Sequence, residues 1–242
     1  MIKCSDGYSA HSAHKAALMR YNCNKPLRCT QHLEKGMFPM TSQDFVTIAT
    51  LPHPLRWHGN PQQWAFSTDH TLSIRAAGRT DWFIDPETGT ASNNAPALLM
   101  PVKAPCLLSA LVEAEHAATF DAGVLFIHQT PQLWAKLCLE RSPQGEVMIV
   151  SVVTNGLSDD CNAMVVPDGR IYLRIAKLER TYAFHYSHDG NRWLLIRHFR
   201  LGDSPEAEIG FLAQSPMGEG CTAHFRHITY RQEKLADIRS QV

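Results

Sequence analysis

The sequence predicts an all-β protein, built as a sandwich or jelly roll of antiparallel sheets. From Met40 onward, short segments rich in β-branched and aromatic residues are separated by turn signals, roughly a dozen or more times. Residues 134–140 alternate strictly between two faces, as a strand does. The run 147–154 is followed directly by Asn155-Gly156, a strong hairpin dipeptide. This spacing of short strands favours a sandwich over a parallel α/β fold.

Composition limits the classes of partner. The 242 residues are 44% hydrophobic, which is ample for a core, and 23 basic and 23 acidic residues give zero formal charge. A chain without excess positive charge offers no electrostatic case for nucleic acid or an anionic membrane. No stretch approaches the roughly 18 apolar residues of a membrane span, and the N-terminus lacks an apolar signal core. Seven scattered cysteines fit reduced thiols, so we expect a cytoplasmic protein.

Residues 1–39 differ from the rest and are expected to form an irregular N-terminal extension to a sandwich domain spanning 40–242. Three cysteines and three histidines occur in this extension, but their spacings match no zinc template, and we expect neither a metal site nor a cofactor. Met40 opens the regular pattern, so one hypothesis places the biological start there. An intact mass matching the full chain would reject that start.

The first half of the domain contains short strands broken by proline and glycine. Residues 55–64, with Pro61, are expected to form a loop or an edge segment. A polar turn at Asp69-His70 joins two neighbouring strands, and the turn at 85–89 follows another. The expected strands in this half are 45–50, 64–67, 71–76, 81–84, 97–102 and 106–114.

Residues 120–160 hold most of the functional candidates. The nearly unbroken apolar run 123–128 is typical of a strand covered on both faces, and Pro131 marks the following turn. In the next strand, Ala135, Leu137 and Leu139 form a core face. The opposite face carries Trp134, Lys136, Cys138 and Glu140. A loop at 142–146 then leads into the strand 147–154.

The second half repeats the pattern of strand and turn. His188-Asp189-Gly190-Asn191 predicts a tight hairpin between two strands. We expect strands at 171–176, 182–187, 193–201, 208–215 and 222–231. Only residues 232–240, at the C-terminus, are expected to be helical.

Several separated motifs carry a resemblance to a known family. They are Asp121-Ala-Gly through Trp134-Ala-Lys136, Val152-Val-Thr-Asn with Ser158-Asp-Asp, Leu173-Arg174, Tyr186-Ser187 with Asp189-Gly190 and Trp193, and Gly210 through Ser215-Pro216. In this order they resemble the "regulation of enolase protein 1" family, from about Thr80 to near Arg239. The resemblance implies the concanavalin A-like sandwich of legume lectins and many glucanases, but no defined reaction.

In that superfamily the concave sheet often carries a groove for sugars. A saccharide site needs an aromatic platform and polar groups for the hydroxyls. Candidates for stacking are Trp82, Trp134 and Trp193. Candidates for hydrogen bonding are Lys136, Glu140, Asn155, Asp159 and Arg174.

Each candidate also has a structural interpretation. A strand tryptophan such as Trp134 is more often part of a core, and Lys136 and Glu140 lie about 13 Å apart along a strand, too far for a direct pair. Turn chemistry explains residues 158–160 equally well. This chain has Asp160-Cys161 where relatives commonly have Trp-Ser, which weakens a specific role for that loop.

Catalysis has weaker support. Glu113 and Glu115 share one strand face, about 6.5–7 Å apart between Cα atoms, but the further acid of the glucanase pattern is absent. Cys138 has no base beside it in sequence, and no Gly-x-Ser-x-Gly occurs. We therefore expect non-catalytic recognition of a carbohydrate or related polar small molecule. The alternatives are a carbohydrate-active hydrolase or lyase, and a regulatory protein-interaction module of unknown oligomeric state.

Overall fold

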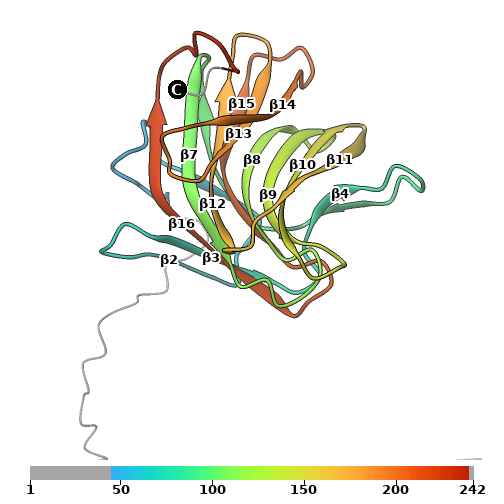
Figure 1. Ribbon diagram of the computed structural model, residues 1–242. Helices are drawn as coiled ribbons and strands as arrows, with labels where there is room; N and C mark the ends of the chain where they lie inside the picture. Colours follow the sequence, from blue (N-terminus) through green and yellow to red (C-terminus); the bar gives the residue numbers. More distant parts are fainter. Residues whose placement is uncertain (1–44, 240–242) are drawn as a thin grey trace, which may run out of the picture. The chain divides into compact units, whose positions relative to one another are not determined.

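The computed structural model describes residues 45–239, and these form an all-β fold (Figure 1). Successive apolar and β-branched segments pair with one another because a strand can bury one face only against a second sheet. The strands are β1 (Arg56–His58), β2 (Gln63–Phe66), β3 (Leu72–Ala77), β4 (Trp82–Ile84), β5 (Ala91–Asn93), β6 (Ala97–Val102), β7 (Cys106–Ala114), β8 (Ala122–Thr130), β9 (Leu133–Arg141), β10 (Val147–Asn155), β11 (Leu157–Val165), β12 (Arg170–Lys177), β13 (Tyr182–Ser187), β14 (Leu194–Phe199), β15 (Ala207–Gln214) and β16 (Gly220–Arg231).

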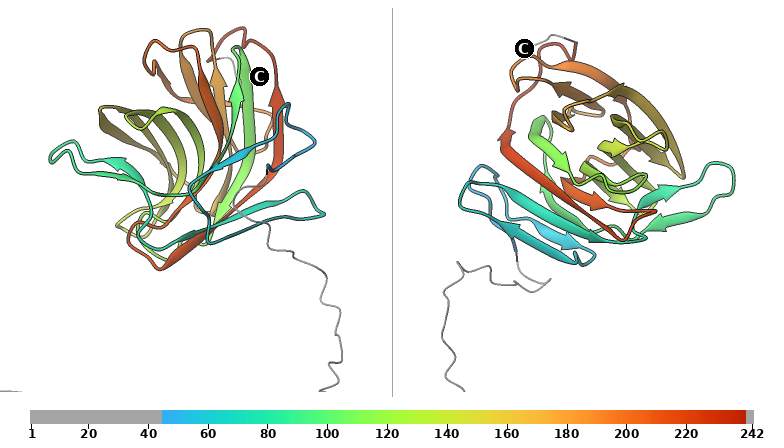
Figure 2. Two further views of the ribbon diagram at one scale, coloured as in Figure 1. Left: turned by 180° about the vertical axis from the view of Figure 1, so that it is seen from behind. Right: turned by 60° about the horizontal axis from the view of Figure 1, so that its bottom comes forward.

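Two antiparallel sheets of seven strands make up the sandwich. The first has the order β1-β6-β15-β8-β9-β10-β11, and the second has the order β14-β13-β12-β7-β16-β3-β2. Strands β4 and β5 form a separate two-stranded hairpin. In Figures 1 and 2 this hairpin stands beside the first sheet, on the side towards which β8, β9 and β10 curve. The predicted sandwich of antiparallel sheets is therefore confirmed.

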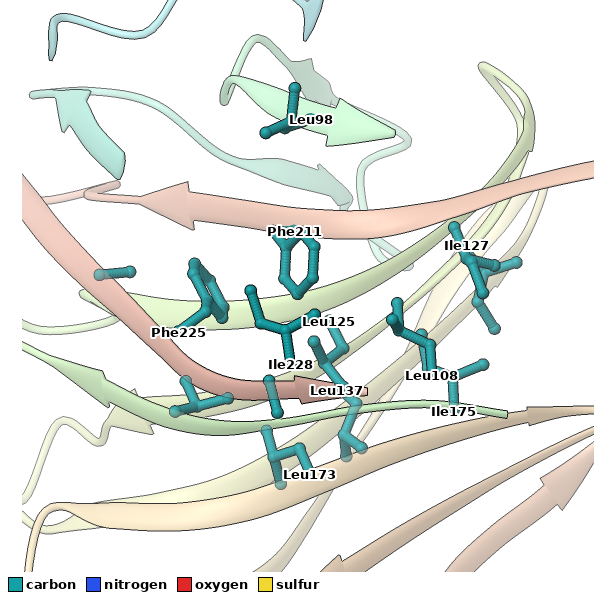
Figure 3. Packing of buried hydrophobic residues seen from close by; sticks show 14 of the residues in the cluster. Leu98, Leu108, Leu125, Ile127, Leu137, Leu173, Ile175, Phe211, Phe225 and Ile228 are labelled. Atoms are coloured by element: carbon teal, nitrogen blue, oxygen red, sulfur yellow. The ribbon is translucent and has the colours of Figure 1, made fainter. Parts of the chain in front are cut away.

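The main core fills the space between the two sheets. Figure 3 shows side chains from both sheets meeting there. Residues at alternate positions of the strands supply it, because successive side chains of a strand point to opposite faces of the sheet. Fully buried members include Leu125, Leu137, Leu173, Phe211 and Phe225.

Most strands occur where the sequence predicts them. The predicted bounds 97–102, 106–114 and 182–187 match β6, β7 and β13. Residues 45–50, expected as a strand, contribute only a single bridge from Val46 to Leu55, and β5 was not predicted. The predicted turn at Asn155-Gly156 is present, with Gly156 at a φ of 79°. Residues 158–160, interpreted as a turn or loop, instead lie within strand β11 (Leu157–Val165).

The expected C-terminal helix is wrong for the part that the structure describes, because residues 232–239 contain no helix. Other contacts hold this segment against the second sheet. Leu235 and Ile238 pack on Leu107, Ala176 and Ala183. Gln232 Nε2 donates hydrogen bonds to the carbonyl oxygens of Pro105 and Lys103, at 2.8 and 3.2 Å. Packing and side-chain bonds thus take the place of helical backbone bonds.

The expected extension at residues 1–39 and the boundary at Met40 lie outside the described residues. Within residues 45–239, no helix is long and apolar enough to cross a bilayer.

Candidate functional site

The outer face of the first sheet is the face turned away from the second sheet. On β9, Ala135, Leu137 and Leu139 enter the core between the sheets. Trp134 and Cys138 belong to a second apolar cluster on the other side, together with Trp82 and Ile84 of the β4–β5 hairpin. The predicted alternation of β9 is confirmed. The outer face is not open, however, because the hairpin packs against part of it.

Strand register brings polar side chains from different strands together on this outer face. Val152 pairs with Lys136 on one side and with Asp160 on the other. Four residues further along β9, Glu140 pairs with Ala122 of β8, and Ala122 pairs in turn with Gln214 of β15. Directly paired residues of an antiparallel sheet share a face. Lys136, Glu140, Asp160 and Gln214 therefore all project to the same side.

Lys136 is the centre of the polar group. Its side chain is buried, with Nζ 2.9 Å from Asp81 Oδ1 and 3.0 Å from Gln214 Oε1. Burial alone would lower the pKa of Lys136, but the carboxylates of Asp81 and Glu140 outweigh it and hold the pKa above its usual value. Lys136 is therefore a positive charge with two of its three donors engaged.

The same network fixes the amide of Gln214. An ammonium group only donates hydrogen bonds, so the Gln214 atom beside Lys136 must be the oxygen. Its Nε2 then donates to the carbonyl oxygen of Phe120 at 3.1 Å and to Glu140 Oε2 at 3.4 Å. The buried amide thus links the lysine to the glutamate.

Glu140 titrates near neutral pH. Burial raises its pKa from 4.5 to about 7, and Asp81 and Asp160 add to the effect of burial, while Lys136 opposes it. A carboxyl group with a pKa near the working pH can exchange a proton with a ligand or with water. Glu140 can therefore serve as a hydrogen-bond donor in its protonated form and as an acceptor when ionised.

These groups border a pocket of about 130 Å³. The pocket is lined by Asp81, Phe83, Phe120, Lys136, Glu140, Val150, Val152, Asp160 and Gln214. Polar atoms and two phenyl rings thus face one small space. We refer to it as the Lys136 pocket.

Phe120 has an unusual backbone conformation at the edge of the Lys136 pocket. Its φ is 66°, in the left-handed region that a bulky residue rarely adopts, and its side chain is exposed. Its N–H donates to the carbonyl oxygen of Arg141 at 2.8 Å, and its own carbonyl oxygen accepts from Gln214. Both hydrogen bonds hold the strained residue in place at the edge of the pocket that it lines.

The expected stacking platform at Trp134 is wrong, because this side chain is fully buried. Its ring lies under Trp82 and beside Phe126, with centroid distances of 5.8 and 5.9 Å. Trp82 is itself buried, and its Nε1 donates to the carbonyl oxygen of Ala95 at 2.9 Å. Both tryptophans form the apolar contact between the hairpin and the sheet, and neither offers a face to a sugar.

Three other predicted site residues lie away from the Lys136 pocket. Asn155 is exposed at the end of β10. Asp159 pairs with Val153, on the face opposite Asp160, and forms an ion pair with Arg197 at 3.0 Å. Arg174 lies on β12 of the second sheet, buried under Trp193 with the guanidinium 4.3 Å from the indole centroid. Of the predicted hydrogen-bonding residues, only Lys136 and Glu140 are brought together.

The candidates for catalysis remain without a catalytic arrangement. Glu113 is hydrogen-bonded to Arg226, and Glu115 forms an ion pair with Arg75 at 3.1 Å. Burial raises the pKa of the Cys138 thiol well above its usual value, so the reactive thiolate is disfavoured. These residues act as structural contacts of their strands.

Sequence reasoning missed seven of the nine residues that line the Lys136 pocket: Asp81, Phe83, Phe120, Val150, Val152, Asp160 and Gln214. Gln214 and Asp160 could have been found by extending the outer-face alternation of β9 to its neighbours, had the pairing of strands been known. No local pattern indicates Asp81 or Phe83, because the hairpin that carries them meets β9 only through the tertiary fold.

Solved structures of other proteins share the fold of this chain. A functionally unknown protein from Saccharomyces cerevisiae superposes with a TM-score of 0.69 at 19% identity, covering 75% of this chain and 97% of that one. The GH43 protein BlXynB (K247S mutant) from Bacillus licheniformis gives 0.56 at 15% identity, covering 73% of this chain but 36% of its own.

An engineered GH43 glycoside hydrolase, described as having endo-xylanase and exo-arabinofuranosidase activity, gives 0.56 at 15% identity, over 82% of this chain and 42% of that one. The chain thus spans less than half the length of these GH43 proteins. At such identities the likeness shows a shared fold.

No curated protein matches the sequence. Residues 57–233 do match a family profile, and this stretch contains the Lys136 pocket and both sheets. The chain therefore belongs to the family described as "Protein of unknown function (DUF1349)", in keeping with the concanavalin A-like resemblance of its motifs.

Proposed function

We propose that the Lys136 pocket binds the polar end of an uncharged carbohydrate or related polyhydroxylated molecule, without chemical change to it. The observation that carries the proposal is the buried network of Lys136, Gln214 and Glu140 bordering a space that also has aromatic walls. A buried polar network is costly to maintain unless its groups are satisfied, so polar atoms facing a pocket favour a polar ligand.

The chemistry of the lining suits hydroxyl groups. Each hydroxyl both donates and accepts a hydrogen bond, and the pocket offers an ammonium donor, carboxylate acceptors and Glu140, which can do either. Phe83 and Phe120 add phenyl rings against which the C–H groups of a pyranose can pack.

Charge argues against an acidic ligand. Asp81 and Asp160 contribute two carboxylates to the pocket against the single ammonium of Lys136, before Glu140 ionises. An additional anion would meet net repulsion, whereas a neutral polyol would not.

Size limits how much of a ligand enters. The volume of about 130 Å³ is well below the roughly 300–1,000 Å³ typical of sites that enclose a whole small molecule. We therefore infer that one end of the ligand enters the pocket and the remainder lies outside it. The description of the GH43 neighbour as an endo-xylanase and exo-arabinofuranosidase suggests pentose-containing oligosaccharides for the first screen.

The experiment is a thermal-shift and calorimetric screen of the full chain against mono- and oligosaccharides. A ligand that binds only the folded state stabilises it by about 2.7 kcal/mol at a hundredfold excess over its dissociation constant. Asp160→Asn removes a charge from the pocket without changing its shape. Asp159→Asn makes the same change one residue away, on the other face of β11, and is the matched control.

A saccharide-dependent shift that is reduced in Asp160→Asn and kept in Asp159→Asn supports the proposal. Phe120→Asn provides a second test, because asparagine tolerates a positive φ and the change replaces the ring by a small amide. Binding that is equal in all three variants would place the ligand elsewhere. An absence of any glycan response would favour the protein-interaction alternative.

A second candidate, a hydrolase or lyase acting on the same ligands, is favoured by one observation, the pKa of about 7 for Glu140. A general acid or base works best with a pKa near the working pH. Turnover of a bound oligosaccharide that is lost in Glu140→Gln, with binding retained, would establish this candidate in place of simple recognition.

A further inference from the structure

A second group of polar side chains lies on the same sheet face as the Lys136 pocket but is not part of it. Ile127 and Ile209 enter the core, so their neighbours His128 and Glu208 point outward, and these two residues are paired directly between β8 and β15. On β1, Trp57 packs against the core, which turns His58 outward as well. Three strands thus present two imidazoles and one carboxylate on one face.

The donor atoms of these three residues converge. His58 Nε2 lies 3.0 Å from Glu208 Oε2, and His128 Nδ1 lies 3.7 Å from the same oxygen. All three donors lie within 4.8 Å of one another. Ligands around one tetrahedral metal ion, each about 2.0–2.2 Å from it, are separated by comparable distances, so small side-chain rotations would complete the arrangement.

His58 approaches Glu208 closely but without good hydrogen-bond geometry. Its Nε2 is buried and lies 3.0 Å from Glu208 Oε2, and this contact is not a well-formed hydrogen bond. A buried nitrogen that lacks a well-formed hydrogen bond is costly. A cation between the two imidazole rings and the carboxylate would be coordinated by the lone pair of His58 Nε2, which gives this nitrogen a partner.

Arg56 orients the carboxylate. Its Nη2 and Nε lie 2.7 and 3.1 Å from Glu208 Oε1, which leaves Oε2 facing the two imidazoles. Outer partners of this kind commonly fix a metal ligand in place. The positive charge of Arg56 opposes a cation, but its side chain is 60% exposed, so water screens much of that repulsion. Glu208 is thereby arranged to bind through a single oxygen.

We propose that His58, His128 and Glu208 form a binding site for a divalent transition-metal ion of the zinc type. Two imidazoles and one carboxylate are a donor set that zinc and similar first-row ions accept, whereas calcium and magnesium prefer oxygen ligands alone. Three protein ligands leave a further coordination position for water or a ligand.

The surroundings give the ion access to solvent. A cleft of about 840 Å³ is lined by His128, Glu208 and Arg56, and also by His53 and Gln129. Two of the three metal ligands therefore border an open space large enough for a small molecule. A group on a bound ligand could reach the open coordination position from this cleft.

Direct metal titration of the full chain tests the site. Chelator-treated protein is titrated with zinc chloride by calorimetry, and with cobalt chloride by visible absorption, with calcium chloride as the hard-cation comparison. Glu208→Gln keeps the shape of the ligand but removes its charge, and His128→Asn removes an imidazole. His53→Gln removes a histidine that lines the same cleft without belonging to the triad and is the matched control.

Removing a residue that only hydrogen-bonds to a metal ligand lowers metal affinity about 10–100-fold. Removing a residue that binds the metal directly should therefore lower zinc affinity by at least about 100-fold. We expect wild type and His53→Gln to bind one zinc equivalent that Glu208→Gln and His128→Asn lose. The cysteines and histidines of residues 1–39 supply a background that is common to all variants, so the difference between variants is decisive. Equal stoichiometry and affinity in all four proteins would overturn the proposal. Circular dichroism verifies folding, and Glu208→Gln decides the test if His128→Asn fails to fold.

Discussion

We expect Glu140 to make the free energy of unfolding depend on pH, and we expect the substitution Glu140→Gln to remove this dependence. Its pKa is raised from 4.5 to about 7 because the ionised form is buried beside other carboxylates. Between these two values the folded state holds a proton that the unfolded state has released. Stability therefore falls as the pH rises through this range, and is constant with respect to this group below about 4.5 and above about 7.

The size of the effect follows from the shift. Each pKa unit corresponds to about 1.4 kcal/mol, so the rise from 4.5 to about 7 corresponds to about 3 kcal/mol. Because the side chain is only 8% exposed, solvent screening does not reduce this figure much. Wild type should lose this amount between acid and mildly alkaline pH, and Glu140→Gln should not.

Urea unfolding of both proteins at pH values from 4 to 8.5 measures the difference. The free energy of unfolding of Glu140→Gln, minus that of wild type, should rise by about 3 kcal/mol across the range, with its midpoint between the two pKa values. All other titrating groups are common to both proteins and largely cancel. Glu87→Gln, an exposed turn residue, controls for the loss of one negative charge. A difference that does not vary with pH would refute the account of Glu140.

Two further predictions concern residues outside the Lys136 pocket. Replacing Arg174 by methionine should raise the free energy of unfolding by about 1 kcal/mol in urea titrations. Burial lowers the pKa of Arg174 to about 10, which corresponds to destabilisation of its charged form by about 3 kcal/mol. Stacking of the guanidinium on Trp193 stabilises the folded state by about 2 kcal/mol and offsets part of this. A marked loss of stability would show that the guanidinium has an acceptor, although none of its nitrogens has one among residues 45–239. Gly210→Ala should destabilise by about 3 kcal/mol or more, because its Cβ would lie 2.1 Å from the backbone carbonyl oxygen of Leu98 on the neighbouring strand. A stable Gly210→Ala protein with an unchanged urea midpoint would contradict this close approach.

Most of the fold was predicted from the alternation of apolar and polar residues along each strand. This alternation placed Lys136 and Glu140 on one face of β9 and the aliphatic residues on the other, as the structure has them. It failed at β11, which pairs only with β10 and is polar and exposed along most of its length. A strand at a sheet edge with little to bury shows no apolar period, so its sequence resembles a loop. The predicted candidate on this strand was Asp159, whereas Asp160 is the residue that lines the Lys136 pocket.

The site itself depended on contacts that sequence spacing does not contain. Trp82 and Trp134 are 52 residues apart, and their burial against each other follows from where the β4–β5 hairpin packs. Arg174 and Lys136 are both basic residues on long strands, yet they belong to opposite sheets. The triad of His58, His128 and Glu208 is assembled from three strands separated by at least 70 residues, so no search for closely spaced ligands could find it.

The β4–β5 hairpin has a consequence for the dynamics of the sheet that it covers. Its attachments include the buried side chains of Trp82 and Ile84, a hydrogen bond from Ile84 N–H to Ser158 Oγ at 2.9 Å, and the ion pair between Asp81 and Lys136. Strand β5 is exposed along its whole length. An element held by so few contacts can detach at a lower free energy than the one needed to unfold the molecule.

Such a partial opening would expose the indole of Trp134 and the ammonium of Lys136 to water while both seven-stranded sheets stayed intact. Backbone amides of residues 82–93 would then exchange with deuterium faster than those of β9, and a ligand bridging Asp81 and Lys136 would slow them. The hairpin would thereby act as a movable cover whose closure and ligand occupancy are thermodynamically coupled.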